Sequence, residues 1–377
     1  MPAATAPCDA ARPVPCLTVR TGRALFSALP ARRPSSGLPP ARGELRRPWA
    51  LSPRAAIPRR PRGLFAALAL LLLLAACAAP APDAMAPSAP GQAGPPRARP
   101  EAPAATPPSA ESQALARYYR LVQDDMLSRG LMRMDGGGPD TPFDARMLAQ
   151  NFLDIALFDE YETLPSGLKV ARKTPAVLRR WPGPIRMSIV FGPSVPPDRR
   201  EADRTMIAGY ATRLSLLTRV PIGITDHNPN FHVLILNEDE RRAFAPQLAQ
   251  MVPGIGAADL AAITDLDRST FCFAYAFSRG GAPSYAQAIA LIRAEHPDLL
   301  RRSCVHEELA QAMGLVNDSP TARPSIFNDD EEFALLTRQD ELMLRILYDP
   351  RLRPGMTEAE ARPIVEAIAV ELLGGEV

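Results

Sequence analysis

Acidic and amide side chains recur along residues 307–318 at the spacing of a helix that does metal-assisted chemistry. Glu307 and Gln311 are four residues apart, so an α-helix places both side chains on one face. Glu308 directly follows the first of them, where a carboxylate can take a proton from an activated water. The positions are those of a hydrolytic site, and the residue types decide which metal, if any, it could use.

Zinc-binding helices carry two histidines four residues apart, with a Glu after the first acting on the metal-bound water. Here the two histidine positions hold Glu307 and Gln311, and the helix-ending glycine is Gly314. A third ligand position falls on Asn317 or Asp318. Zinc prefers nitrogen and sulfur ligands, whereas calcium takes six to eight oxygens. The sequence therefore predicts no bound metal, with zinc or calcium as the alternatives.

A purely structural interpretation of this segment is also open. Glu307 and Gln311 could hydrogen-bond each other and the nearby backbone as a buried polar network. Glu307 and Glu308 are neighbours on the helix, so their side chains are expected to diverge. His306 is expected to be a partly buried polar residue rather than a catalyst. The run from Asp329 to Glu332 is interpreted as a solvated acidic face, or else as a rim that attracts cations.

The N-terminal part has the features of a secretion signal. Arg54, Arg59, Arg60 and Arg62 precede an apolar run of 13 residues, Leu64 to Ala76, that ends in Leu-Ala-Ala-Cys. This run is shorter than the roughly 18 residues that a membrane span needs. The ending resembles a bacterial lipobox, which implies that Cys77 carries lipid and becomes the mature N-terminus. Residues 1–76 are therefore interpreted as an N-terminal extension and lipoprotein signal peptide, and a misassigned start codon would explain the first 50.

Removal of this segment changes the charge balance. The segment before Cys77 holds 12 Arg and two acidic residues, which leaves 31 basic and 39 acidic residues and a net charge of about −8. This charge argues against nucleic acid as a partner. Residues 77–110 are rich in Ala, Pro and Ser and are interpreted as a disordered tether. Cys8 and Cys16 lie in the removed segment and Cys77 takes lipid, so Cys272 and Cys304 remain as a possible disulfide pair.

Residues 111–377 are expected to fold as a single α+β domain. A stripe from Leu115 to Met126 predicts a helix, and Thr141 with Asp144 predicts a capping box that opens a second one, within a helical extension over 111–175. Residues 176–350 are expected to form a mixed twisted sheet and the motif helix. The predicted strands are 185–191, 231–236 and 271–277, with a helix over 198–217 between the first two. Residues 285–292 are expected to be the hairpin partner of 271–277, with a helix as the alternative. Helices capped by Thr337 and Thr357 are expected to follow, the last within 351–377.

These segments resemble two groups of proteins. The residues from about 111 onward are similar to an uncharacterised family of bacterial lipoproteins, domain of unknown function 2927. Three stretches carry this resemblance: Cys304 to Leu315, Ser325 to Asp330, and Leu336 to Pro350. The element order from Trp181 to Tyr348 also resembles the metzincin-like metallopeptidase scaffold, which implies Glu308 as general base and Glu307, Gln311 and Asn317 at the ligand positions. No Met stands in residues 320–335, where that scaffold has its Met-containing turn.

Two functions are consistent with this pattern. In the first, a membrane-anchored lipoprotein domain that lacks the zinc-ligand histidines binds a peptide or protein of the cell envelope without catalysis. In the second, Glu308 is the general base of a metal-dependent or unusual peptidase or hydrolase. The lipid on Cys77 implies a periplasm-facing location, and Ala78 after it is compatible with the outer membrane.

Overall fold

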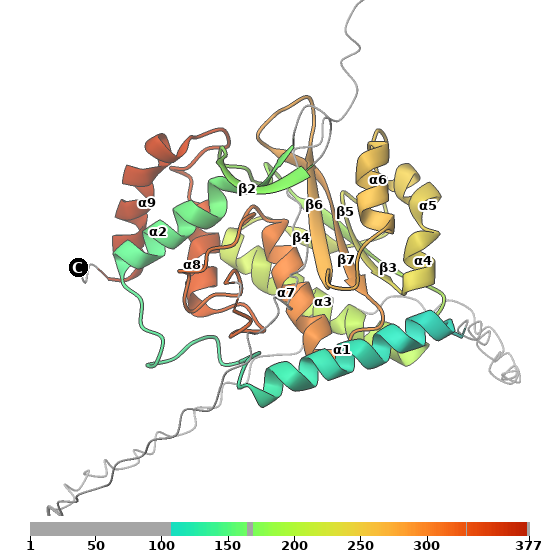
Figure 1. Cartoon of the computed structure of the whole chain (residues 1–377). Coiled ribbons are helices and arrows are strands. Elements are labelled where there is room, and N and C mark those ends of the chain that lie inside the picture. The colour runs from blue at the N-terminus through green and yellow to red at the C-terminus, as the bar shows by residue number, and fades with distance from the viewer. Residues whose placement is uncertain (1–106, 164–168, 329, 375–377) are drawn as a thin grey trace, which may run out of the picture. The chain divides into compact units, whose positions relative to one another are not determined.

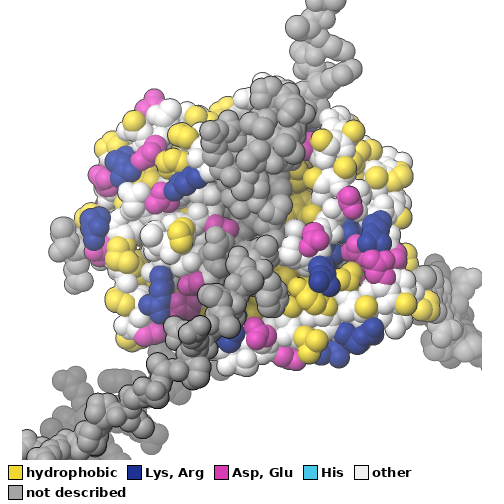
Figure 2. Space-filling view, in the orientation of Figure 1, with side chains coloured by type: hydrophobic (Ala, Val, Ile, Leu, Met, Phe, Trp, Pro, Cys, Tyr) yellow, Lys and Arg dark blue, Asp and Glu magenta, His cyan; other side chains and the backbone are white. Residues whose placement is uncertain are grey.

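A computed structural model describes residues 107–163, 169–328 and 330–374 of the chain (Figure 1). The predicted signal segment 1–76, Cys77 and nearly all of the tether lie outside the described residues. None of the described helices is long and apolar enough to cross a membrane. On the face drawn in Figure 2, basic and acidic side chains of the described residues are interspersed rather than gathered into one patch.

The centre of the fold is a five-stranded sheet. Its strands are β3 (Ile185–Phe191), β4 (Ile222–Ile224), β5 (Phe231–Leu236), β6 (Cys272–Ser278) and β7 (Tyr285–Arg293), in the spatial order β4-β3-β5-β7-β6. All pairs are parallel except that of β6 with β7, which is an antiparallel hairpin across Gly280 and Gly281. This confirms the predicted mixed sheet and places β6 at its edge.

Helices cover both faces of this sheet (Figure 1). Alternation along β6 directs Phe273, Tyr275 and Phe277 to one face, where three short helices pack. These are α4 (Glu238–Arg242), α5 (Ala245–Met251) and α6 (Ala257–Thr264), none of which the sequence pattern predicted. Ala274 and Ala276 point to the other face, against α7 (Asp298–Gln311), which also packs against α3 (Pro197–Thr218). Their small side chains let α7 lie close to the edge strand.

A group of helices from both ends of the described chain adjoins the second face. It consists of α2 (Ala145–Ala156), α8 (Arg338–Leu347) and α9 (Glu358–Leu372), which contact one another, while α1 (Ala110–Ser128) contacts α4. The capping boxes predicted at Thr337 and Thr357 are confirmed. The cap predicted at Thr141 is wrong, because Asp144 caps α2 by accepting from the Met147 N–H.

The span 111–175 is not purely helical. After α2 it forms the antiparallel pair β1 (Phe158–Thr163) and β2 (Lys169–Pro175), which is separate from the main sheet. The sequence Phe-Asp-Glu-Tyr-Glu-Thr lacks a clear apolar alternation, which is why the periodicity did not reveal this strand. The described part of the extension is therefore two helices and a two-stranded hairpin.

Candidate functional site

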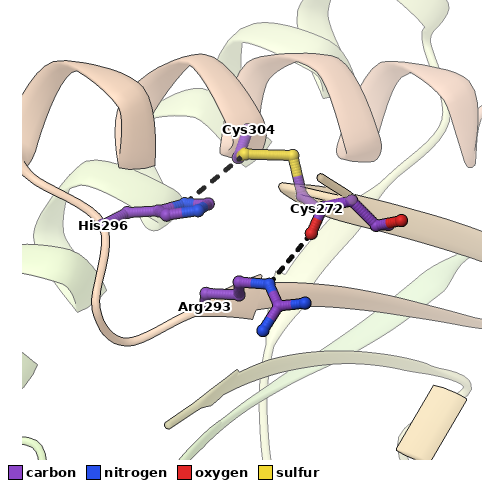
Figure 3. The surroundings of a disulfide bond; sticks show 5 residues. Cys272, Arg293, His296 and Cys304 are labelled. Carbon is purple, nitrogen blue, oxygen red and sulfur yellow. Dashed lines mark hydrogen bonds between the residues drawn. A yellow bond between two sulfur atoms is a disulfide. The ribbon is translucent and has the colours of Figure 1, made fainter. Parts of the chain in front are cut away.

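The motif helix α7 is fixed to the edge strand by a covalent bond. Cys304 on α7 and Cys272 at the start of β6 form the predicted disulfide, with an S–S distance of 2.08 Å and Cα atoms 5.8 Å apart (Figure 3). Helical spacing places Glu308 and Gln311 on the same stripe as Cys304, four and seven residues further on. That stripe of α7 therefore faces the edge of the sheet.

A buried histidine borders the disulfide. The Nδ1 atom of His296 lies 3.7 Å from the Cys304 sulfur (Figure 3). Burial lowers the pKa of His296 well below its usual value, and the nearby Arg293 and Arg301 act in the same direction. Arg293 is itself held by the Thr270 carbonyl and by Glu238. His296 is therefore a neutral residue that packs beside the disulfide.

The two glutamates of the motif lie closer together than helix geometry alone suggested. Glu308 is 1% exposed and Glu307 is partly exposed. Each offers a carboxylate oxygen, and these oxygens and the Cys272 sulfur all lie within 4.8 Å of one another. The expectation that the neighbouring carboxylates diverge is thus wrong, since both reach the start of β6.

These groups are a poor metal site. The Cys272 sulfur is bonded to Cys304 and is not a thiolate, which is the form that binds metal. Two carboxylates fall short of the six to eight oxygens that calcium requires, and zinc prefers imidazole or thiolate ligands. Glu307 and Glu308 are the residues that could contact an ion, yet they lack the donors to hold one tightly.

The side-chain amide of Gln311 is buried without the hydrogen bonds that buried amides usually make. Its side chain is 1% exposed, and within the described chain neither Oε1 nor Nε2 has a hydrogen-bond partner. The proposed hydrogen bond between Gln311 and Glu307 is therefore wrong. Burying an amide without partners costs about 1–3 kcal/mol for each polar group, so this position stabilises the fold poorly.

Gly314 allows the chain to leave α7 in close contact with another segment. Its φ is +125°, and a Cβ atom there would lie 2.3 Å from the carbonyl oxygen of Arg179. Only glycine adopts such a conformation without strain and avoids the overlap. The role expected for Gly314 at the end of the helix is consistent with this geometry.

Asn317 and Asp318 do not join the two glutamates. The Asn317 Nδ2 donates to the Asp154 carbonyl at 2.9 Å, and its backbone N–H donates to Ile155 at 3.0 Å. Among the described residues, the acidic group near α7 includes Glu307 and Glu308 but not Asp318. Asn317 thus ties the exit of the motif helix to the end of α2.

Three aromatic residues that no local sequence pattern singled out hold α7 and the turn after it through backbone carbonyl groups. The Trp181 Nε1 donates to the Ala312 carbonyl and the Tyr348 hydroxyl to that of Met313, both at 2.8 Å. Ala312 and Met313 form the turn directly after α7, so these two side chains fix the exit of the helix. The third, Tyr210, contacts the helix at His306. Nothing in the local sequence signals these contacts, because the partners are 35 to 131 residues apart.

His306 also has a structural role. Its Nδ1 accepts the backbone N–H of Leu336 at 3.1 Å, and its side chain is buried. Burial lowers the pKa of His306 to about 3, and Arg213 and Arg302 contribute. A neutral ring with one nitrogen engaged by the backbone fits the predicted polar core residue.

The loop between α7 and α8 is organised by one buried carboxylate. Asp340 accepts from the Ser325 hydroxyl at 2.6 Å, from the Ile326 N–H at 3.1 Å and from the Thr337 N–H at 2.8 Å. Burial raises the pKa of Asp340 to about 6, although these hydrogen bonds oppose the shift. The segments 325–330 and 336–350 are thereby joined to each other.

The acidic run after this loop is not a purely solvated face. Glu332 forms ion pairs with Arg133 and Arg323, at 3.0 and 2.6 Å. These two guanidinium groups lower the pKa of Glu332. Asp329 lies outside the described residues.

Together, the mixed sheet, its antiparallel edge strand and the acidic and amide helix beside it define an α+β domain with a polar motif at the sheet edge. The model of the family described as protein of unknown function DUF2927 matches residues 145–367. This is more than half of the chain, and the chain belongs to that family. The match runs from the first residue of α2 into α9. Searches of curated proteins and of solved structures returned no match.

Proposed function

We propose that the folded part of this chain is a non-catalytic binding domain of a membrane-anchored envelope lipoprotein, and that it binds a peptide along the outer edge of β6. The observation that carries this proposal is the state of the three ligand positions. Asn317 uses its amide to hold α2, Gln311 has an amide in place of an imidazole, and Glu307 stands beside a sulfur that is already bonded. These three positions offer neither the imidazole nitrogen nor the thiolate sulfur that a tight zinc site needs.

The position of β6 supports peptide binding. In the described chain no strand pairs with its outer edge, and edge strands offer backbone groups to which an extended peptide can add. The four mutually parallel strands, the antiparallel edge strand and the helix that follows β7 also agree with the metzincin-like element order. The basic signal segment and the lipobox-like ending at Cys77 support lipid anchoring and an envelope location.

A hydrolase is the second candidate, and one observation favours it. The carboxylate oxygens of Glu307 and Glu308 lie within 4.8 Å, as paired carboxylates do in acid–base catalysis. In this case Glu308 would be the general base. The carboxylate pair is the only observation in favour of a hydrolase, and a fold alone confers no activity. The hydrolase is therefore ranked second.

Two measurements separate the candidates. Elemental analysis of the purified chain is expected to find well below one zinc per chain, and one equivalent would overturn the binding-domain proposal. Glu308→Gln is expected to change the stability of the fold, and neither this variant nor wild type is expected to hydrolyse peptides or esters. Its control is Glu201→Gln, on the exposed side of α3. A peptidase or esterase activity that wild type and Glu201→Gln share and Glu308→Gln lacks would establish the hydrolase instead.

A further inference from the structure

The unpartnered amide of Gln311 indicates a ligand. A glutamine side chain offers two N–H donors and a carbonyl acceptor, and buried side chains usually have these satisfied. Here the side chain is 1% exposed and both polar atoms lack partners in the described chain. A molecule that both accepts from Nε2 and donates to Oε1 would satisfy the side chain.

The surroundings of this amide define the charge of that molecule. Gln311 is four residues after Glu307 and three after Glu308, so all three side chains lie on neighbouring rows of α7. Cys304, on the same stripe, is bonded to Cys272 of β6, which turns the cluster toward the edge strand. The glutamate oxygens lie within 4.8 Å of the Cys272 sulfur and of each other. The ligand therefore meets two carboxylates and an amide next to the strand edge.

A basic side chain fits this set of groups better than a metal ion does. An ammonium or guanidinium carries several N–H donors, and charge-assisted hydrogen bonds to carboxylates are the strongest that proteins make. It does not need the six to eight oxygens of calcium or the nitrogen ligands of zinc. A peptide that carries it also has backbone carbonyl groups, which can accept from the Gln311 Nε2.

We propose that Glu307, Glu308 and Gln311 form a recognition site for one lysine or arginine side chain of a peptide bound along β6. The carboxylates and the Gln311 Oε1 accept from the cationic group, and the Gln311 Nε2 donates to a carbonyl of the same peptide. This inference rests on the proposed function and adds the chemistry of the ligand. It gives a role to the buried Gln311 amide, whose burial without partners the packing of the fold does not explain.

The test uses a phage-displayed library of random 12-residue peptides, panned on the purified full chain. Enriched peptides are expected to share Lys or Arg at one position. For a synthetic copy of an enriched peptide, replacement of that residue by norleucine is expected to weaken binding at least about ten-fold in fluorescence anisotropy. Glu307→Gln in the protein is expected to do the same, whereas Glu201→Gln should bind like wild type.

Gln311→Met separates recognition from folding. Met keeps the length of the side chain and removes both unpartnered polar atoms, so the midpoint of urea unfolding should stay or rise while peptide binding weakens. If peptides bind equally well with norleucine, or to Glu307→Gln, the basic-residue site is wrong and the binding domain stands. If panning enriches no peptide at all, the proposed function fails along with it.

Discussion

Tyr210 on α3 lies flat against His306 on the motif helix. The ring centroids are 4.0 Å apart with an interplanar angle of 14°, and the Tyr210 hydroxyl donates to the His306 carbonyl at 2.7 Å. One aromatic residue thus contacts both the ring and the backbone of the residue that precedes Glu307. The register of α7 against α3 depends on this pair.

Tyr210→Phe is therefore expected to destabilise the protein by about 1–2 kcal/mol, because it keeps the stacked ring and removes one buried hydrogen bond. Urea unfolding followed by circular dichroism measures the change. The control is Tyr118→Phe on α1, whose hydroxyl makes no hydrogen bond within the described chain and whose removal should cost less than about 0.5 kcal/mol. Equal effects of the two substitutions would show that the Tyr210 hydroxyl does not hold α7.

The low pKa of His306 predicts acid sensitivity. The unfolded chain binds a proton at this residue near pH 6.5, whereas the folded chain does so only near pH 3. The stabilisation is therefore fully present above pH 6.5 and is lost as the pH falls toward 3. His306→Asn keeps an acceptor for the Leu336 N–H and cannot titrate.

The decline in unfolding free energy between pH 6.5 and 4 should be smaller in His306→Asn than in wild type, by about 3 kcal/mol. Urea titrations at several pH values measure it. His227→Asn, at an exposed position after β4, is the control and should follow wild type. A decline of the same size in His306→Asn and wild type would assign the acid sensitivity to other groups.

Gly314→Ala is expected to cost more than about 3 kcal/mol. The new methyl group would overlap the Arg179 carbonyl, and the backbone would be strained at a φ of +125°. Gly209→Ala is a matched control within α3, because no atom lies within 4 Å of its Cβ position. That change should stabilise the protein by about 0.5–1 kcal/mol through helix propensity. Thermal unfolding of both variants compares them, and a tolerated Ala at 314 would contradict the close approach.

Loss of the disulfide should destabilise the domain by roughly 4 kcal/mol, since it closes a loop between residues 32 positions apart. Urea unfolding with and without a reducing agent measures this in the wild-type chain. The double variant Cys272→Ala, Cys304→Ala should resemble the reduced protein and should not respond to the reductant. If it does respond, a second disulfide contributes to the stability.

Local signals predicted the elements well where the relevant contacts are local. Thr337 and Thr357 cap their helices through residues three positions on, so a short window is sufficient to find them. Near the start of α2, both Thr141 and Asp144 were possible N-cap residues within the same short window. There the Thr hydroxyl bonds the turn at Gly138, and Asp144 caps the helix. The helices α4 to α6 are five to eight residues long, too short for periodicity to identify.

The candidate site was predictable in its residues but not in their contacts. The spacing of Glu307, Glu308 and Gln311 follows from the sequence alone. The convergence of the two carboxylates depends on β6, which the disulfide holds beside the helix. The bond from Asn317 to Asp154 joins residues 163 positions apart, and no sequence window contains both.

That last bond also bears on protein engineering. Substitution of histidine at positions 307, 311 and 317 is the simplest design for a zinc site on this backbone. The third change would remove the donor that now fastens the last turn of α2. A designer would therefore have to rebuild the end of α2 together with the metal ligands, because Asn317 already serves the packing of that helix.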